Sequence, residues 1–362
     1  MSIDWARAGA VRTVRTVLPA ALAVALSGPS AVAQMPASRA VEAVSYTNPV
    51  DGTRLTGWLA LPGTAGPHPG IVVLSIAGTD PLVDRLVDDG YAVLTPERRG
   101  FVDVEPLLRA TYVDLSQDVL AALDFLRSRD EVDPGALVLI AQGDDTPPAM
   151  LAVVASAPAI PLVLLAPPAL SGVETFRLEQ RGAALRDRAR PDELEALDRY
   201  VEGIAEVVLG ESEPYLRAYR LESLRSGSPV QLPRSAAFPS DERQMHFFAS
   251  PLWHDRLAFE PREVFARLRA RVLVLIGSED ANTPMEEYLA SVRSGLEAGP
   301  TTDATVCLLP GRTRHAFTEE GVSAIAEWLS ARVATRAELR APSMERVGSP
   351  GAPGGCLEAV DR

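Results

Sequence analysis

Three short segments of the chain carry residue types that together could perform acyl transfer. Residues 141–145 follow an apolar run with the length and β-branched content of a buried strand. Asp280 follows the apolar residues 273–276, and His315 follows the apolar residues 305–309. In a parallel sheet such positions meet beyond the carboxyl ends of the strands, where ligands bind. The order turn, acid, histidine is one in which a serine–histidine–acid triad occurs along a chain.

The first segment departs from the pattern that this chemistry needs. A strand, a sharp turn and a helix with the sequence G-x-S-x-G place a serine nucleophile at the turn. Residues 141–145 read Ala-Gln-Gly-Asp-Asp, so Gly143 stands where the serine would be. Glycine offers no group that a histidine could activate. The backbone N–H of Asp144 would be the oxyanion donor, but its carboxylate and that of Asp145 oppose a developing negative charge.

The acid and the histidine have ordinary structural readings when each is taken alone. Asp280 could cap the helix that follows it, and His315 could be a loop residue. Their order along the chain, each after an apolar strand, makes them candidates for the acid that orients a histidine and for that histidine.

Strands and helices alternate along most of the chain, which indicates a mostly parallel sheet with helices on both faces. Between residues 171 and 261 this alternation stops, and charged helical patterns are followed by Pro-rich irregular sequence. We interpret this stretch as a helical cap inserted on top of the sheet. The expected strands are residues 41–47, 54–61, 70–75, 91–95, 137–141, 161–166, 271–276 and 304–309, and the expected helices of the core are 80–89, 114–129, 149–157, 284–297 and 318–333.

A turn is expected at residues 133–135, and a strand-end loop is expected at residues 98–100.

The same patterns divide the chain into five parts. The five parts are a signal peptide in residues 1–33, the first part of the core in 41–170, the helical cap insertion in 171–262, the second part of the core in 263–335 and a tail without regular structure in 341–362.

Several segments resemble the bacterial α/β-hydrolases of the serine aminopeptidase-like and acyl-thioesterase-like type, over most of residues 41–333. The resemblance implies an α/β-hydrolase fold with a helical cap, a Ser-His-Asp triad and hydrolysis of esters, thioesters or peptides. The segments that carry it are Asp51-Gly52 with Leu55-Thr56-Gly57, Leu61-Pro62 with residues 66–69, Ala110-Thr111 with residues 118–123, Arg127, Asp133-Pro134 and the strand that leads into residue 141.

The chain differs from this family at its most reactive positions. The family's turn reads Gly-His-Ser-x-Gly-Gly, and residues 141–146 keep none of its fixed positions. The family's oxyanion loop is rich in Gly or His-Gly, whereas residues 75–78 read Ser-Ile-Ala-Gly, so Ile76 and Ala77 mark an altered oxyanion region. The family's acid and histidine are matched by Asp280 and His315.

We favour a non-catalytic or strongly altered hydrolase fold that binds a small ester, thioester or peptide-like ligand under the cap, because fold does not fix function. One alternative is an active hydrolase with a relocated nucleophile, for which Asp144, Ser75 and Ser278 are candidates. Another is a water molecule activated by His315 and Asp280. A metal held by these carboxylates and the histidine is not expected, because carboxylates at a helix N-terminus are usually caps. No cofactor is expected.

Composition limits the partners. With 362 residues and 47% hydrophobic content the chain is globular, and its net charge of -13 argues against nucleic acid and anionic membrane surfaces. Cys307 lies in an expected core strand and Cys356 in the tail. We interpret them as two thiols, although an oxidising compartment would permit a bridge. The oligomeric state is not indicated.

The N-terminal segment has the features of a signal peptide. Arg7, Arg12 and Arg15 precede the apolar residues 17–26, and the small residues 31–33 follow them. The apolar run is too short to span a bilayer well, so no stable membrane span is expected after cleavage. The expected location is therefore secreted or periplasmic.

We predict that the exported protein begins at Gln34, because cleavage after Ala33 fits the small-residue pattern. Intact-mass measurement of protein recovered from the exported fraction tests this. A mass that includes residues before Gln34 would contradict the cleavage site.

Overall fold

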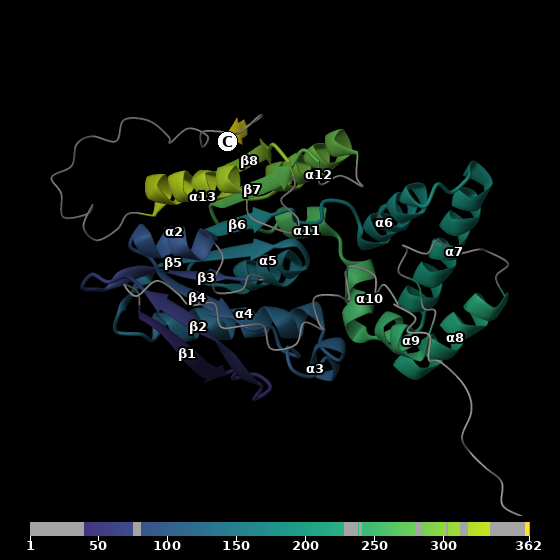
Figure 1. Ribbon diagram of the computed structural model, residues 1–362, viewed down its shortest axis with the longest axis horizontal. Coiled ribbons are helices and arrows are strands. Elements are labelled where there is room, and N and C mark those ends of the chain that lie inside the picture. The colour runs from purple at the N-terminus through teal and green to yellow at the C-terminus, as the bar shows by residue number, and fades with distance from the viewer. Residues whose placement is uncertain are drawn as a thin grey trace, which may run out of the picture.

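A single sheet of nine strands forms the centre of the computed structural model, which describes residues 40–74, 81–227, 238, 241–279, 284–301, 303–311, 318–333 and 359–361 (Figure 1). The strand order is β1-β2-β4-β3-β5-β6-β7-β8-β9. The run from β4 to β8 is parallel, whereas β1, β2 and β9 pair antiparallel with their neighbours. The strands are β1 (Ala40–Thr47), β2 (Arg54–Leu61), β3 (His68–Val73), β4 (Ala92–Pro96), β5 (Val132–Gln142), β6 (Leu162–Leu165), β7 (Val272–Gly277), β8 (Ala304–Leu309) and β9 (Ala359–Asp361).

Helices cover both faces of this sheet, which confirms the predicted fold class (Figure 1). Within the described residues no helix is long and apolar enough to cross a membrane. The helices are α2 (Pro81–Asp88), α3 (Glu105–Leu108), α4 (Tyr112–Arg127), α5 (Thr146–Ala155), α6 (Gly172–Arg186), α7 (Pro191–Gly210), α8 (Pro214–Gly227), α9 (Glu242–Ala249), α10 (Pro251–Ala258), α11 (Pro261–Phe265), α12 (Met285–Ala298) and α13 (Glu319–Arg332), and a 3-10 turn, η1, spans Gly143–Asp145.

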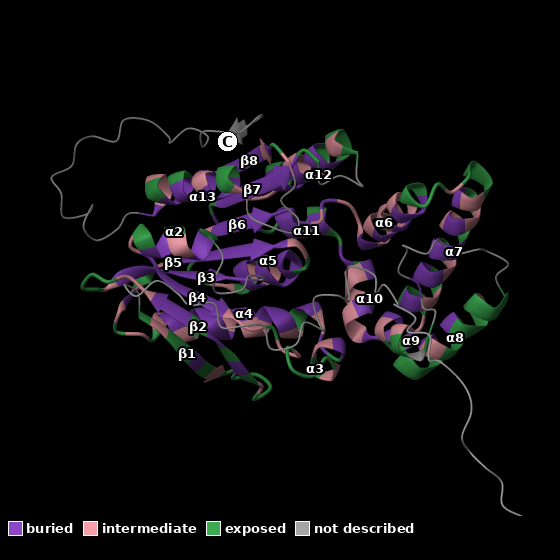
Figure 2. Ribbon diagram, viewed as in Figure 1, coloured by how far each residue is buried: buried purple, intermediate pink, exposed green. Residues whose placement is uncertain are grey.

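Residues 137–142 of β5 are buried on both faces, between β3 and β6 (Figure 2). Leu137, Leu139 and Ala141 pack with α4, α5, α11 and α12, whereas Val138 and Ile140 pack with α2 and α13. This alternation is the geometry of a strand, and burial on both sides explains why its sequence is a continuous apolar run. The strand that leads to residue 143 therefore lies inside the sheet, where its carboxyl end is held from both sides.

The turn expected at residues 133–135 is wrong, because these residues belong to β5. The register with β3 passes from Pro69 opposite Asp133 directly to Gly70 opposite Leu137. Residues 134–136 therefore form an irregularity within a strand that pairs with β3 on both sides of it.

The C-terminal region also differs from the expectation. β9 lies within the predicted irregular tail and pairs with β8, which places Val360 opposite Val306. Strand β8 would otherwise present an open edge whose backbone groups seek partners. Cys307 of β8 is disulfide-bonded, so its interpretation as a thiol is wrong. Cys356 lies outside the described residues.

Helices α6–α10 lie between β6 and β7 in the sequence, and we call them the helical insertion (Figure 1). They have a hydrophobic cluster of their own. In it the ring centroid of Trp253 lies 4.5 Å from that of Phe248 and 5.2 Å from that of Phe176. α9 and α10 occur where Pro-rich irregular sequence was expected. Ser250 caps α10 by accepting a hydrogen bond from the backbone N–H of Trp253, and Pro251 begins the helix.

A buried arginine joins two turns inside the helical insertion. Arg217 of α8 is 3% exposed and donates to the carbonyl oxygens of Ala249 at 2.7 Å and Ser250 at 3.2 Å. It also donates to the carbonyl oxygen of Glu211 at 2.8 and 3.0 Å. The turn between α7 and α8 is thereby tied to the junction of α9 and α10.

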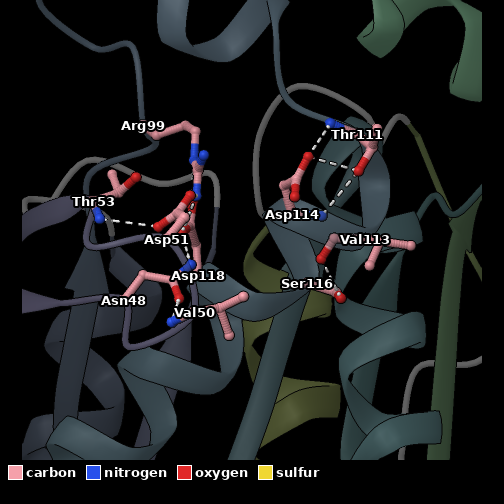
Figure 3. A network of polar contacts seen from close by, with 10 residues as sticks. All are labelled: Asn48, Val50, Asp51, Thr53, Arg99, Thr111, Val113, Asp114, Ser116 and Asp118. Carbon is pink, nitrogen blue, oxygen red and sulfur yellow. Dashed lines mark hydrogen bonds and ion pairs between the residues drawn. The ribbon is translucent and has the colours of Figure 1, made fainter.

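A second polar network fixes the β1–β2 turn against the core (Figure 3). Arg99, which follows β4, donates to both carboxylate oxygens of Asp118 on α4 at 2.6 Å and to Asp51 at 2.9 Å. The side-chain amide of Asn48 donates to Asp118 at 2.7 Å. The hydrogen-bonded Asp118 carboxylate raises the pKa of Arg99, even though burial opposes this shift.

We predict that Asp118→Ala lowers the free energy of unfolding by about 2–4 kcal/mol, because it leaves the buried Arg99 guanidinium and the Asn48 amide without their shared partner. The control is Asp124→Ala on the same helix, whose side chain is 67% exposed and whose ion pair with Arg127 should contribute less than about 1 kcal/mol. Urea denaturation of both variants tests this. Equal effects would contradict the role given to Asp118.

Candidate functional site

The turn after β5 has the geometry that the sequence predicts for residue 143. β5 ends at Gln142, Gly143–Asp145 form the 3-10 turn, and α5 begins at Thr146. Gly143 has a φ of 56°, in the left-handed region where glycine is favoured over residues with a Cβ. The Thr146 hydroxyl donates to the Gly143 carbonyl oxygen at 2.6 Å and fixes the turn from its helical side.

Four of the predicted site residues, Asp280, His315, Ile76 and Ala77, lie outside the described residues. The described residues reach Glu279, directly before the acid, and Gly311, four positions before the histidine. The backbone N–H of Ser278 donates to the Leu309 carbonyl oxygen at 2.8 Å, and the backbone N–H of Glu279 donates to the Gly311 carbonyl oxygen at 2.9 Å. The chain therefore leaves β7 and β8 side by side, and the meeting of acid, histidine and Gly143 stays a prediction.

Both carboxylates of the turn are paired with arginines. Asp145, which is 7% exposed, accepts a hydrogen bond from Arg98 in the loop after β4. The Asp145 charge raises the pKa of Arg98, against the effect of burial. Asp144 accepts a hydrogen bond at 3.0 Å from Arg256 of α10. The negative charge that the sequence places beside Gly143 is therefore compensated on both carboxylates.

Arg256 connects the helical insertion to this turn. Besides Asp144, its guanidinium donates from Nη2 to both carboxylate oxygens of Glu179 on α6, at 3.0 and 3.1 Å. It also lies over the ring of Trp253, 5.2 Å from the centroid. Burial would lower the pKa of Arg256, but the two carboxylates outweigh it and raise that pKa. Arg256 is therefore charged at any physiological pH.

The backbones of the insertion and the core approach each other closely near Arg256. The N–H of Gly172, the first residue of α6, donates to the Phe259 carbonyl oxygen at 2.9 Å. The Asp255 carboxylate accepts a hydrogen bond at 2.8 Å from the backbone N–H of Tyr112, the first residue of α4. A carboxylate at this position satisfies an N–H that no helical carbonyl reaches.

A small pocket lies between the turn and the insertion. It is lined by Gly143 and Asp144 of the turn, Tyr112 of α4, Arg256 of α10 and the ring of Phe259. The rings of Tyr112 and Phe259 are in edge contact, with centroids 5.6 Å apart. The cavity volume is about 30 Å³, which accommodates a small polar group rather than a whole substrate.

Tyr112 is the first residue of α4. A capping box between Thr111 and Asp114 fixes this end of the helix (Figure 3). The Thr111 hydroxyl oxygen accepts from the backbone N–H of Asp114 at 3.1 Å, and the Asp114 carboxylate accepts from that of Thr111 at 2.8 Å. Burial raises the pKa of Tyr112, so its hydroxyl stays protonated at neutral pH.

Sequence reasoning did not identify Tyr112, Glu179 or Arg256 as site residues, and it gave Arg98 only a role in loop shape. The pair Ser250-Pro251 is a helix-start signal that could have revealed α10 and hence Arg256. In the part of the chain that the structure describes, no three His, Cys, Asp or Glu side chains are grouped so that they could hold a metal ion.

Comparison with known proteins identifies the fold. No family model and no curated protein sequence matches the chain. An esterase from Pyrococcus furiosus matches its structure with a TM-score of 0.51, at 14% identity over 83% of this chain and 95% of that one. An acetyl xylan esterase from Paenibacillus sp. R4 matches with a TM-score of 0.50, at 20% identity over 83% and 86%. A 2,6-dihydroxy-pseudo-oxynicotine hydrolase matches with a TM-score of 0.50, at 16% identity over 86% and 70%.

These solved structures have the α/β-hydrolase fold, and so does this chain. At such low identities the likeness concerns the fold alone, and the activity of the site has to be argued from its residues.

We predict that Gly172→Ala lowers the free energy of unfolding by about 1–3 kcal/mol, because a Cβ there would lie 1.9 Å from the carbonyl oxygen of Arg256. Hydrogen exchange in residues 251–258 should rise at the same time. The control is Gly210→Ala at the end of α7, where nothing lies within 4 Å of an added Cβ, and it should leave stability unchanged or raise it slightly. A Gly172→Ala variant as stable as this control would refute the close contact.

Proposed function

We propose that this protein is a non-catalytic member of the α/β-hydrolase fold that binds a small ester, thioester or peptide-like ligand, with the helical insertion acting as a cap over the turn at Gly143. The observation that carries the proposal is Gly143 itself. It occupies the strand–turn–helix junction of the central strand with a positive φ, where this fold presents its nucleophile. A residue with no side chain can neither attack a carbonyl nor be activated by a base.

The contacts of Asp144 speak against a nucleophile shifted by one residue. Asp144 follows the residue with the positive φ, and its carboxylate is held by Arg256. A carboxylate that attacks carbon needs an oxygen directed at the substrate. In this structure an Asp144 oxygen faces a guanidinium of the insertion, which supports binding rather than covalent chemistry.

Export to a secreted or periplasmic location is part of the proposal. The N-terminal segment that suggests it lies outside the described residues. The disulfide bond of Cys307 supports it independently, because disulfides persist in oxidising compartments and are rare in the cytosol.

We predict that the purified protein neither hydrolyses p-nitrophenyl butyrate above the buffer rate nor reacts with a fluorophosphonate probe. Gly143→Ser should gain probe labelling at residue 143 if His315 and Asp280 complete the site, although with slow turnover. Gly143→Ala is the matched control: it carries the same backbone cost at a positive φ, about 1–3 kcal/mol, without the hydroxyl. Both variants should therefore lose similar stability, and only the serine variant should be labelled.

Hydrolysis by the unaltered protein would refute the proposal. If that activity disappeared in His315→Ala, it would favour water activated by His315 and Asp280. Labelling mapped to Ser75 or Ser278 would instead indicate a relocated nucleophile.

A further inference from the structure

Arg256 lines the pocket with hydrogen-bonding capacity that the protein does not use. A guanidinium has five N–H donors in a fixed plane. Nη2 donates to Glu179 and Nη1 donates once to Asp144. The Nε–H and the second Nη1–H make no hydrogen bond to any residue that the structure describes. The Arg256 side chain is only 20% exposed, so its two remaining N–H groups favour a ligand that accepts hydrogen bonds.

The hydroxyl of Tyr112 on α4 is a second hydrogen-bond donor at this pocket. The residue is 8% exposed and lines the same pocket, yet its hydroxyl makes no hydrogen bond within the described part of the chain. Its backbone and ring are fixed, by Asp255 at the N–H and by the ring of Phe259. The fold therefore fixes the position of the Tyr112 side chain, but no described residue forms a hydrogen bond with its hydroxyl.

The other walls of the pocket are apolar. Pro147, Ala166, Pro168 and Phe259 line it together with the two donors. The Thr175 hydroxyl, which also lines it, donates to the Leu170 carbonyl oxygen at 3.3 Å. The site thus combines two hydrogen-bond donors, one of them cationic, and the Asp144 carboxylate with apolar surface and a cavity of about 30 Å³.

We propose that this pocket binds the carboxylate of a small carboxylic acid, with the Arg256 guanidinium and the Tyr112 hydroxyl as its donors. The apolar walls contact the first methylene groups of the acid, and the rest of its hydrocarbon part extends out of the cavity. This inference rests on the proposed function, which it narrows from ester, thioester or peptide-like ligands to the free acid.

Charge distinguishes the free acid from its neutral and cationic analogues. A carboxylate accepts charge-assisted hydrogen bonds that are roughly twice as strong as those of a neutral ester carbonyl. A protonated amine has no lone pair that could accept a hydrogen bond from Arg256 or Tyr112. Asp144 already occupies one N–H of Arg256, with its side chain 62% exposed, so it competes with the ligand from the solvent side.

The test measures binding of hexanoate to the mature protein at pH 7 by ligand-observed NMR, against methyl hexanoate and hexylamine. Hexanoate should bind with a Kd on the order of 1 mM, as expected for a ligand of this size, and at least about tenfold more tightly than either analogue. Methyl hexanoate or hexylamine binding as tightly as hexanoate would overturn the proposal, and so would the absence of hexanoate binding.

Substitutions test whether Arg256 and Tyr112 are the donors that bind hexanoate. Tyr112→Phe removes a hydroxyl that the fold does not use, so it should weaken hexanoate binding about 3- to 10-fold with unchanged stability. Arg256→Gln should weaken it about 10- to 100-fold. Asp144→Asn should tighten it about 2- to 5-fold by removing the competing charge, whereas Asp124→Asn, the same charge change on an exposed site of α4, should have no effect.

An unchanged affinity in both Tyr112→Phe and Arg256→Gln would refute the pocket as the binding site.

The proposed function and this inference are refuted by different results. Ester hydrolysis by the unaltered protein refutes the non-catalytic function whatever hexanoate does, and a lack of hexanoate binding refutes this inference while leaving the absence of catalysis intact.

Discussion

The close junction of β5 and α5 is the constraint on which the rest of this site depends. β5 is enclosed by β3 and β6 and by helices on both faces, so its carboxyl end cannot shift sideways. The chain enters α5 within three residues, and it does so through a left-handed turn at Gly143. In a fold that uses such a turn to present a reactive side chain, a glycine keeps the geometry and relaxes its strain.

Charge pairing across elements holds this turn in place. Asp145 is tied to Arg98 from the loop after β4, and Asp144 is tied to Arg256 from the helical insertion. Each carboxylate thereby joins the turn to a different part of the molecule.

The sequence predicted the sheet well, because runs such as that in β5 are buried on both faces and read as apolar whatever packs on them. It also identified Gly143 correctly as the turn residue. It missed α9 and α10, because helices of eight residues beside prolines contain too few turns for a period to be recognised. It also missed β9, whose pairing depends on the open edge of β8 rather than on its own composition. Arg256 and Tyr112 lie 144 positions apart, and only tertiary packing brings them to one pocket.

The contacts of Arg217 have a consequence for how the protein responds to acid. Its partners inside the helical insertion are carbonyl oxygens, which do not titrate. The polar side-chain contacts between insertion and core use carboxylates instead: Asp144 with Arg256, Asp255 with Tyr112, and Glu105 with His246. The hydrogen bond with His246 lowers the pKa of Glu105, so this contact is lost as the pH falls through that lowered value, whereas the Arg217 junction contains no carboxylate. Acidification therefore weakens a contact between α9 of the insertion and α3 of the core while the Arg217 junction inside the insertion is unaffected.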